Sequence, residues 1–261
     1  MSVAVINSFK SEWLKKRRTA AFWLVIIGGF FIPAIMFAGA FVNIDSTVKA
    51  VNTPGFWNSY HRNCWQFMAV FLLPVGVIMS TSLITQLEYR NNTWKQLHTT
   101  PQTYPLIFFT KLSVIITMML QFFIFFNIGV YLSGILPSII SAKIPFPKQP
   151  YPWQFLWQYN EAYFVDCLPM IALQYLVSLK YKNFLVAIGI GLGILLASLF
   201  AVQWKYGYVF PYTYCILHFL GKDGIENTYF TSLTIHYFAL AYFILFTIAS
   251  YFLYITKKEK G

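Results

Sequence analysis

Residues that could bind nucleotide or carry out hydrolysis are the first features to test in this chain of 261 residues. A phosphate-binding loop of the form G-x-x-x-x-G-K-[ST] needs two glycines and a lysine that reaches the phosphates. The pair Gly221-Lys222 has Ile216 in place of the first glycine and Asp223 in place of Ser or Thr. The spacings H-E-x-x-H and G-x-S-x-G are also absent from the sequence. The sequence therefore predicts no catalytic residue, and we do not expect the chain to be an enzyme by itself.

Soft metal ligands form a second candidate group. Cys64, Cys167 and Cys215 all fall in segments predicted to lie toward the outer side of a membrane. Their neighbours in the sequence include His61, Met68, Met170 and His218. Thiolate and thioether ligands suit Cu(I), but no C-x-x-C or H-x-x-x-H spacing brings these residues together. Metal binding, a disulfide between two cysteines and inert packing all remain open, and the spacing predicts no metal site.

A polar stretch holds the most distinctive combination of side chains. Residues 86–101 have the sequence QLEYRNNTWKQLHTTP, and Lys111 follows ten residues later. The pattern predicts a short amphipathic helix that must end at Pro101. One face of that helix would present Leu87, Arg90 or Asn91, Trp94 and Leu97. The helix could anchor a soluble partner through Trp94, or it could be solvated without a partner.

The composition indicates where such a helix would be held. Hydrophobic residues make up 58% of the chain, aromatic residues 20% and charged residues only 10%, against roughly 25% charged residues in a soluble domain. Apolar runs of about 20 residues are long enough to cross a hydrocarbon core of about 30 Å. The sequence therefore predicts an all-α integral membrane protein in which residues 1–261 form a single transmembrane domain.

Six apolar runs are predicted to span the membrane. They cover residues 20–42, 64–86, 112–136, 163–179, 184–202 and 235–255. Residues 2–18 are predicted to form an amphipathic interfacial helix whose basic residues, including Lys16, meet lipid head groups, although a plain basic anchor fits as well. Residues 203–234 are predicted to be external. Within them, residues 208–219 are too hydrophobic for a solvated loop and too short to span, which indicates a re-entrant or interfacial segment.

The charge distribution orients these spans. A net charge of +11 could indicate a nucleic-acid partner, but 13 of the 19 lysines and arginines fall in segments assigned to the cytoplasm, as the positive-inside rule requires. We therefore expect both chain ends to be cytoplasmic and no nucleic acid to bind. Glu161 and Asp166 are predicted to lie at the outer end of the fourth span. The middles of the spans should then be uncharged, which argues against an ion-driven pump.

Small residues distinguish the fifth span. Because small side chains let helix backbones approach closely, they mark either a subunit or pathway interface or ordinary packing within the bundle. The candidate residues for helix packing or a pathway are Gly189, Gly191, Gly193 and Ser198 on the fifth span, with Met79 and Ser82 on the second.

The polar stretch resembles a segment of the permease subunits of type-2 ABC exporters, particularly the small six-helix permeases of lantibiotic-immunity and bacitracin-resistance systems. Their segment after the second helix reads approximately E-x-R-x-x-G-T-W-K-x-L, followed by a Pro and a Lys. The matching residues here are Glu88, Arg90, Thr93, Trp94, Lys95, Leu97, Pro101 and Lys111. Asn92 replaces the usual Gly. Residues 168–174 and Asn183-Phe184 are similar to the fourth and fifth helices of the same permeases.

The resemblance implies that residues 87–101 form a coupling helix seated in a separate ABC ATPase subunit. The coupling residues would be Glu88, Arg90, Trp94, Lys95, Leu97 and Pro101. It also implies two ATPase copies that carry ATP and Mg, no cofactor in this chain, and a second permease chain that is either identical or a close paralogue. The expected location is the bacterial cytoplasmic membrane.

The function that follows from the resemblance is export of an amphipathic substrate, either a peptide antibiotic or a lipid-like molecule, in antibiotic resistance or immunity. Three alternatives stay open. The chain could be an immunity or sensory module that binds a ligand without moving it, a channel that needs no ATPase, or an intramembrane enzyme without a recognised motif.

Overall fold

A computed structural model describes residues 2–17, 19–90, 103–222 and 232–256. Every regular element within these residues is a helix. Six helical stretches are long and apolar enough to cross a membrane, namely Ala20–Val42, Phe56–Leu87, Tyr104–Ile140, Trp153–Lys180, Phe184–Ala201 and Thr234–Thr256. These stretches confirm the predicted all-α integral membrane fold with six spans.

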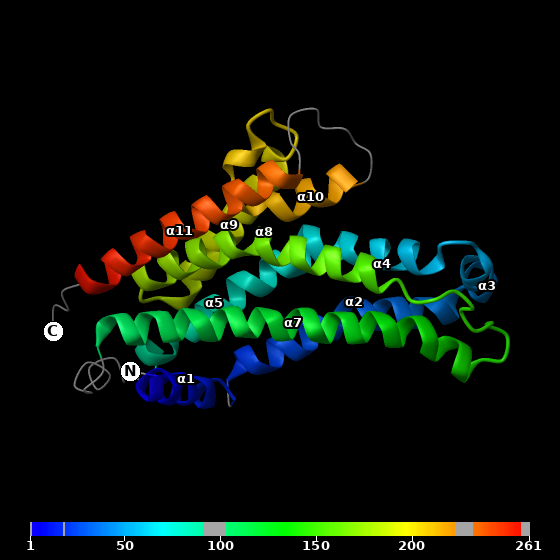
Figure 1. The fold of residues 1–261 in the computed structure, drawn as a ribbon, viewed down its shortest axis with the longest axis horizontal. Helices are drawn as coiled ribbons and strands as arrows, with labels where there is room; N and C mark the ends of the chain where they lie inside the picture. The colour runs from blue at the N-terminus through cyan, green and yellow to red at the C-terminus, as the bar shows by residue number, and fades with distance from the viewer. Residues whose placement is uncertain (1, 18, 91–102, 223–231, 257–261) are drawn as a thin grey trace.

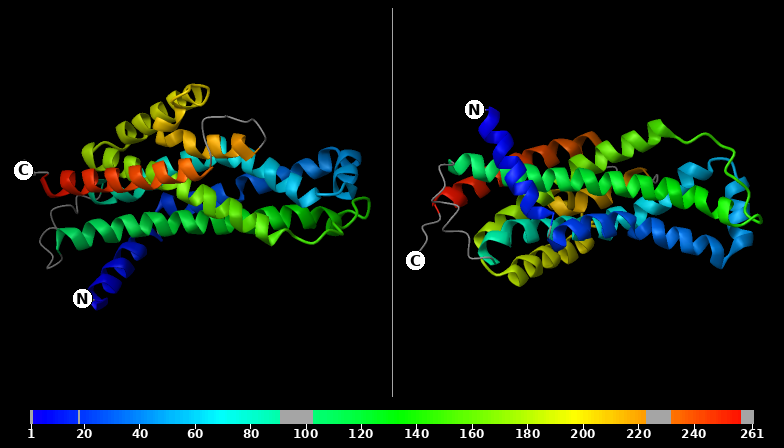
Figure 2. Two further views of the ribbon diagram at one scale, coloured as in Figure 1. Left: turned by 45° about the horizontal axis from the view of Figure 1, so that its top comes forward. Right: turned by 90° about the horizontal axis from the view of Figure 1, so that it is seen from below.

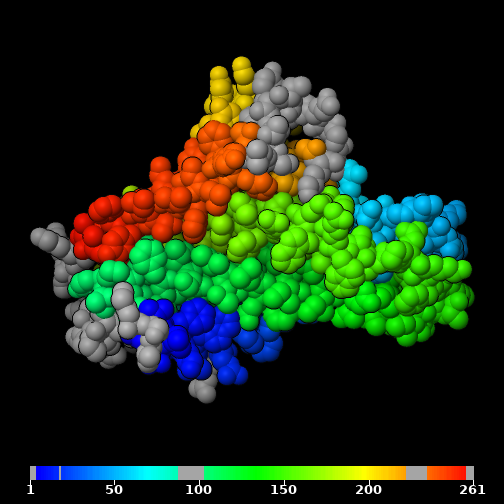
Figure 3. Space-filling model, viewed as in Figure 1, coloured from blue at the N-terminus to red at the C-terminus, as the bar shows by residue number. Residues whose placement is uncertain are grey.

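The helices form an elongated bundle in which α7 (Tyr104–Ile140) runs nearly the full length of the molecule (Figure 1). Helix α2 (Ala20–Val42) packs along α7, and α11 (Ser232–Thr256) packs along α8 (Trp153–Lys180). Figure 3 shows α7, α8 and α11 side by side on one face. The start of α1 (Ser2–Lys16) and the end of α11 lie at the same end of the bundle (Figure 1), as a topology with both chain ends on one side requires.

The second span passes through a proline without breaking. It consists of α4 (Phe56–Phe67), the π-helical turn η1 (Met68–Leu72) and α5 (Leu73–Arg90). Pro74 has no N–H to donate, and its ring would clash with the carbonyl four residues earlier in a regular helix. In the π-helical turn the N–H of Leu73 donates instead to the carbonyl of Met68, which widens the helix just before Pro74.

Three of the spans begin at least eight residues earlier than the sequence predicts. The second span starts with α4 at Phe56 rather than near residue 64. Helix α7 starts at Tyr104 rather than near residue 112, and α8 starts at Trp153 rather than near residue 163. Asp166 consequently lies midway along the 28 residues of α8, and its side chain is buried. The prediction that Asp166 lies at the outer end of its span, with no charged residue in the middle of any span, is therefore wrong for this helix.

The remaining elements connect or flank the long spans. Helix α3 (Ile44–Asn52) follows α2 and lies at the end of the bundle opposite the chain ends (Figure 1). Helix α9 (Phe184–Ala201), the fifth span, follows α8 after a brief turn. The chain then folds into two 3-10 turns, η2 (Gly207–Val209) and η3 (Pro211–Thr213), and helix α10 (Tyr214–Lys222). Helix α10 contacts α8, η1 and α11. The two turns and α10 are all too short to span a membrane. This part of the predicted external segment is therefore helical and packs onto the bundle.

The side chain of Gln149 attaches the loop between α7 and α8 to the start of α4 by hydrogen bonds. Its Oε1 accepts hydrogen bonds from the backbone N–H groups of Gly55 (2.9 Å) and Phe56 (3.1 Å), and its Nε2 donates to the carbonyl of Thr53 (2.8 Å). The indole of Trp57 donates to the Gln149 carbonyl at 3.2 Å. Because the first N–H groups of a helix have no partner within the helix, Gln149 supplies α4 with a cap. Gly55 precedes the helix with φ of 81°, a left-handed conformation that favours glycine.

Helix α1 lies at an angle to the bundle, across α7 (Figure 2). The side chain of Lys16 is only 1% exposed, its Nζ donates to Oε1 of Gln121 at 2.6 Å, and it lies 3.4 Å from the centre of the Trp13 ring. Burial lowers the pKa of Lys16 to about 8. The prediction that Lys16 meets lipid head groups is therefore wrong, because this lysine attaches α1 to α7.

Candidate functional site: a buried polar network

Four side chains form a hydrogen-bond network where α5, α8, α9 and η3 meet. The Nε2 of Gln174 donates to Oγ of Ser82 at 2.8 Å and to the carbonyl of Ala187 at 3.0 Å. The hydroxyl of Tyr212 donates to Oε1 of Gln174 at 3.2 Å. The hydroxyls of Ser82 and Ser178 lie 3.2 Å apart. We call Ser82, Gln174, Ser178 and Tyr212 the Gln174 network.

All four side chains of the Gln174 network are buried at 0% exposure. An unsatisfied amide or hydroxyl in apolar surroundings costs about 1–3 kcal/mol, and Gln174 avoids that cost by bonding through both its nitrogen and its oxygen. The network joins two spans to the segment after α9: sliding of α5 against α8 would break the Ser82–Gln174 bond, and displacement of Gln174 would disturb its bond to Tyr212 in η3. Such a junction is suited to passing a movement of the helices to the outer segment, by which we mean η2, η3 and α10.

The three glycines predicted to serve helix packing or a pathway differ in burial. Gly191 is buried, and a Cβ at this position would lie 2.5 Å from Oε1 of Gln174 and 2.9 Å from Cγ2 of Ile78. Gly189 and Gly193 have no atom within 4 Å of such a Cβ and are exposed. Burial therefore separates Gly191 from Gly189 and Gly193, although all three glycines belong to the same span.

Three further predicted residues lie in or near the interior. Ser82 belongs to the Gln174 network, and Met79 is half-buried on the same helix. Ser198 is buried on α9 and donates to the carbonyl of Leu195 at 2.6 Å. The structure thus brings Ser82 and Gly191 together around Gln174. The role of Gln174, Ser178 and Tyr212 was not predicted, although a buried hydrogen-bonding side chain in an otherwise apolar span is the signal that could have identified them.

The predicted coupling residues lie mostly outside the described part of the chain. Glu88 and Arg90 fall in the last turn of α5, where the side chains are not described. The remaining coupling residues, Trp94, Lys95, Leu97 and Pro101, lie outside the described residues. Just before this segment, Nε2 of Gln86 donates to the carbonyl of Tyr181 at 2.9 Å. This bond ties the end of α5 to the turn between α8 and α9.

The three cysteines are buried, and none of them forms a disulfide in the structure. The thiol of Cys167 donates to the carbonyl of Phe164 at 3.1 Å. Among the described residues, His218 is part of a cluster of possible metal ligands, but its companions are Asp166 and His236 rather than any cysteine. The set of soft ligands considered from the sequence is therefore not the set that the fold brings together.

Comparison with protein families identifies the class of this bundle. A family model described as "ABC-2 family transporter protein" matches residues 8–198, which include the segment between α5 and α7 and all of the Gln174 network except Tyr212. No curated protein and no solved structure matches the chain significantly. With six apolar helices and a family match over well more than half of its length, the chain belongs to the ABC-2 transporter family and is a membrane permease component of the ABC transporter type.

Proposed function

We propose that the chain is the permease subunit of an ABC exporter and couples ATP hydrolysis by separate ATPase subunits to export of an amphipathic substrate, such as a peptide antibiotic or a lipid-like molecule. The observation that carries this proposal is the place of the segment between α5 and α7. It lies inside the family match, and both flanking helices reach the end of the bundle where α1 begins and α11 ends (Figure 1). A soluble ATPase would dock at that end.

In this proposal the chain performs no covalent chemistry. ATP and Mg belong to two copies of the partner ATPase, and residues 87–101 receive the movement of that partner, with Trp94 as the anchor. The Gln86–Tyr181 hydrogen bond would carry a displacement of α5 to the turn between α8 and α9. The Gln174 network would carry it onward to Tyr212 and the outer segment.

The exposed face of α9 supports pairing with a second permease chain, which we propose to be another copy of this one. Gly189, Gly193 and Ala197 are exposed at intervals of four residues, so they form one stripe along the helix. Small residues at this spacing let two membrane helices approach closely. A Cβ at either glycine meets nothing within 4 Å, so the fold of the single chain does not itself require glycine there.

The decisive experiment is co-purification of the chain with a candidate ABC ATPase subunit expressed together with it. We expect a stoichiometric complex that is lost, together with ATPase stimulation, in Trp94→Ala and in Glu88→Ala. Trp157→Ala is the matched control, because Trp157 is 71% exposed near the start of α8, outside the coupling segment. A complex that survives Trp94→Ala would contradict coupling through this segment.

Transport assays separate export from the alternatives. The proposal requires export from cells expressing both proteins, and its loss when the ATPase cannot hydrolyse ATP. Ligand binding without nucleotide-dependent export would instead identify an immunity or sensory module, and transport by the chain alone would identify a channel. Expression in a bacterium with a fluorescent reporter tests the expected inner-membrane location, and protection against lantibiotics or bacitracin tests the proposed resistance subgroup.

A further inference from the structure

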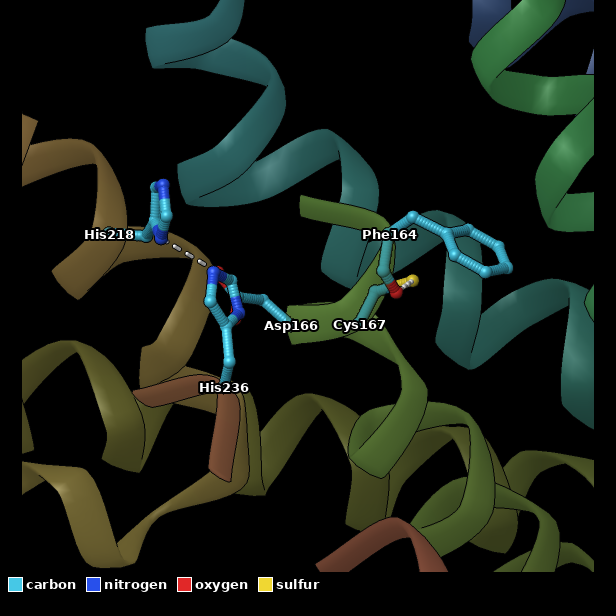
Figure 4. Close-up of polar contacts among 5 residues, drawn as sticks. All are labelled: Phe164, Asp166, Cys167, His218 and His236. Atoms are coloured by element: carbon cyan, nitrogen blue, oxygen red, sulfur yellow. Dashed lines mark hydrogen bonds and ion pairs between the residues drawn. The ribbon is translucent and has the colours of Figure 1, made fainter. Parts of the chain in front are cut away.

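Three side chains from distant parts of the sequence converge near the middle of α8. Asp166 lies on α8, His218 on α10 and His236 near the start of α11. The Nδ1 of His218 lies 3.3 Å from Oδ2 of Asp166, and the Nδ1 of His236 lies 3.0 Å from Oδ1. Figure 4 shows both imidazoles on the same side of α8, directed toward the carboxylate. We call these three residues the Asp-His-His cluster.

The spacing of the Asp-His-His cluster matches that of ligands around one metal ion. One ligand atom from each residue can be chosen so that all three lie within 4.8 Å of one another. Ligands bound tetrahedrally to zinc at about 2.0–2.2 Å are about 3.3–3.6 Å apart. The two imidazole nitrogens lie 3.3 and 3.0 Å from the two carboxylate oxygens of Asp166, close to that value, so an ion could be accommodated by small movements of the side chains.

Packing alone gives no reason for these residue types. The side chains of Asp166 and His218 are 0% and 2% exposed, and apolar residues of similar volume would hold α10 against α8 without the cost of removing a carboxylate from water. An ionisable group within a membrane span indicates a functional site, and its partners identify the kind. Two imidazoles and a carboxylate from three helices form the ligand set of a divalent transition-metal site with an open fourth position.

The chemistry of the cluster narrows the class of ion. Imidazole and carboxylate ligands suit Zn²⁺ and similar divalent ions, whereas Cu(I) prefers thiolates and thioethers. Cys167 adjoins Asp166 in the sequence, but its thiol points to the other side of α8 (Figure 4) and donates to the carbonyl of Phe164. The side chain of His236 is 26% exposed, so an ion can reach the cluster from the surface.

The geometry points to a binding site for a single divalent transition-metal ion of the Zn²⁺ class, held by Asp166, His218 and His236, that braces α10 and the start of α11 against α8. The three helices it joins include the short helix that follows η3 and the last span. Such an ion would hold α10 and the start of α11 in one position, whether or not residues 87–101 bind an ATPase. The metal site can therefore be tested separately from the proposed ATPase coupling.

The test is zinc binding by the full chain, purified through an affinity tag without histidine and stripped with a chelator. We expect one zinc ion per chain by elemental analysis after the stripped chain is reloaded with zinc chloride and desalted, and saturable binding in calorimetric titration of the stripped chain with zinc chloride alone. His236→Gln should weaken binding at least about tenfold, because even loss of an outer-shell partner costs 10–100-fold in affinity. Asp166→Asn and His218→Gln should do the same.

Controls keep the result independent of folding. His61→Gln replaces a buried histidine outside the cluster and should bind zinc like the natural chain. The absorption spectrum of bound Co²⁺ in the natural chain should show nitrogen and oxygen ligands without a thiolate charge-transfer band, and this measurement needs no variant. The absence of zinc binding, binding that survives all three substitutions, or a thiolate band that disappears in Cys167→Ala or Cys215→Ala would each overturn the assignment.

Discussion

Gly191 packs against the Gln174 network and leaves no room for a larger side chain. Because a Cβ there would lie 2.5 Å from Oε1 of Gln174, Gly191→Ala must displace a side chain that is held by three hydrogen bonds. We expect the free energy of unfolding to fall by about 1–3 kcal/mol, the usual cost of overpacking a filled interior. Thermal unfolding in detergent measures this. Gly189→Ala is the control and should leave the melting temperature unchanged or higher, since its Cβ meets nothing within 4 Å.

Lys16 predicts a pH dependence. Burial lowers its pKa to about 8 from 10.5, so between these values the unfolded chain holds a proton that the folded chain has released. The free energy of unfolding must therefore rise with pH over this window. We expect the melting temperature of the natural chain to rise between about pH 8 and about pH 10 relative to that of Lys16→Met. If Lys10→Met, at an exposed position of α1, removes the same pH dependence, the effect does not come from Lys16.

At the scale of residues, the sequence identified Ser82 and Gly191 as special but not the side chain that connects them. Gln174 stood in a stretch similar to known permeases, yet its partners Ser82 and Tyr212 are 92 and 38 residues away in the sequence. The Asp-His-His cluster was missed for the same reason. Asp166 and His236 come together only because α11 packs along α8, which periodicity within one helix cannot reveal.

At the scale of elements, hydropathy predicted some helix ends to the residue and misplaced others. The first span was predicted at residues 20–42 and is observed as α2 with the same bounds. Helix α8 was predicted to start ten residues too late, because Trp153 to Ala162 include polar and aromatic side chains that lower the hydropathy without breaking the helix. The π-helical turn η1 could not be predicted, since Pro74 is compatible with a kink or a break as well.

Gln149 predicts that one loop side chain stabilises the start of a span. Gln149→Leu removes three hydrogen bonds and leaves two N–H groups at the start of α4 without their cap. We expect the free energy of unfolding to fall by about 0.5–2 kcal/mol, as on loss of a helix cap. Proteolysis of the loop should also become faster. Gln154→Leu, at an exposed position in α8, should change neither, and equal effects of both substitutions would argue against a capping role.

At the scale of the whole molecule, the exposed stripe of α9 predicts the oligomeric state. We expect Gly189→Leu combined with Gly193→Leu to weaken association of two chains at least about tenfold, or about 1.4 kcal/mol, without lowering the melting temperature. Native mass spectrometry in detergent and cross-linking in membranes measure this. The control is Gly39→Leu on α2, which is exposed and has equally open surroundings. A double variant that remains dimeric would place the second chain on another face.

The architecture as a whole was more predictable than the site. Six spans and two chain ends at one end of the bundle follow from apolar runs and from the positions of Lys and Arg, because the bilayer constrains both. The interior contacts depend on how the helices are rotated and tilted. Rotation and tilt are set by individual pairs of side chains such as Lys16 with Gln121, in which a basic residue expected at the lipid surface instead joins two helices.

Helix α7 has a mechanical consequence that follows from its length. Its 37 residues extend about 55 Å at 1.5 Å per residue, almost twice the thickness of the hydrocarbon core. It begins next to the segment with the coupling residues and ends at the loop that carries Gln149. A continuous helix of this length moves as a rigid body. A small tilt at its start therefore displaces its far end and the loop that carries Gln149, and this displacement does not depend on a chain of side-chain contacts.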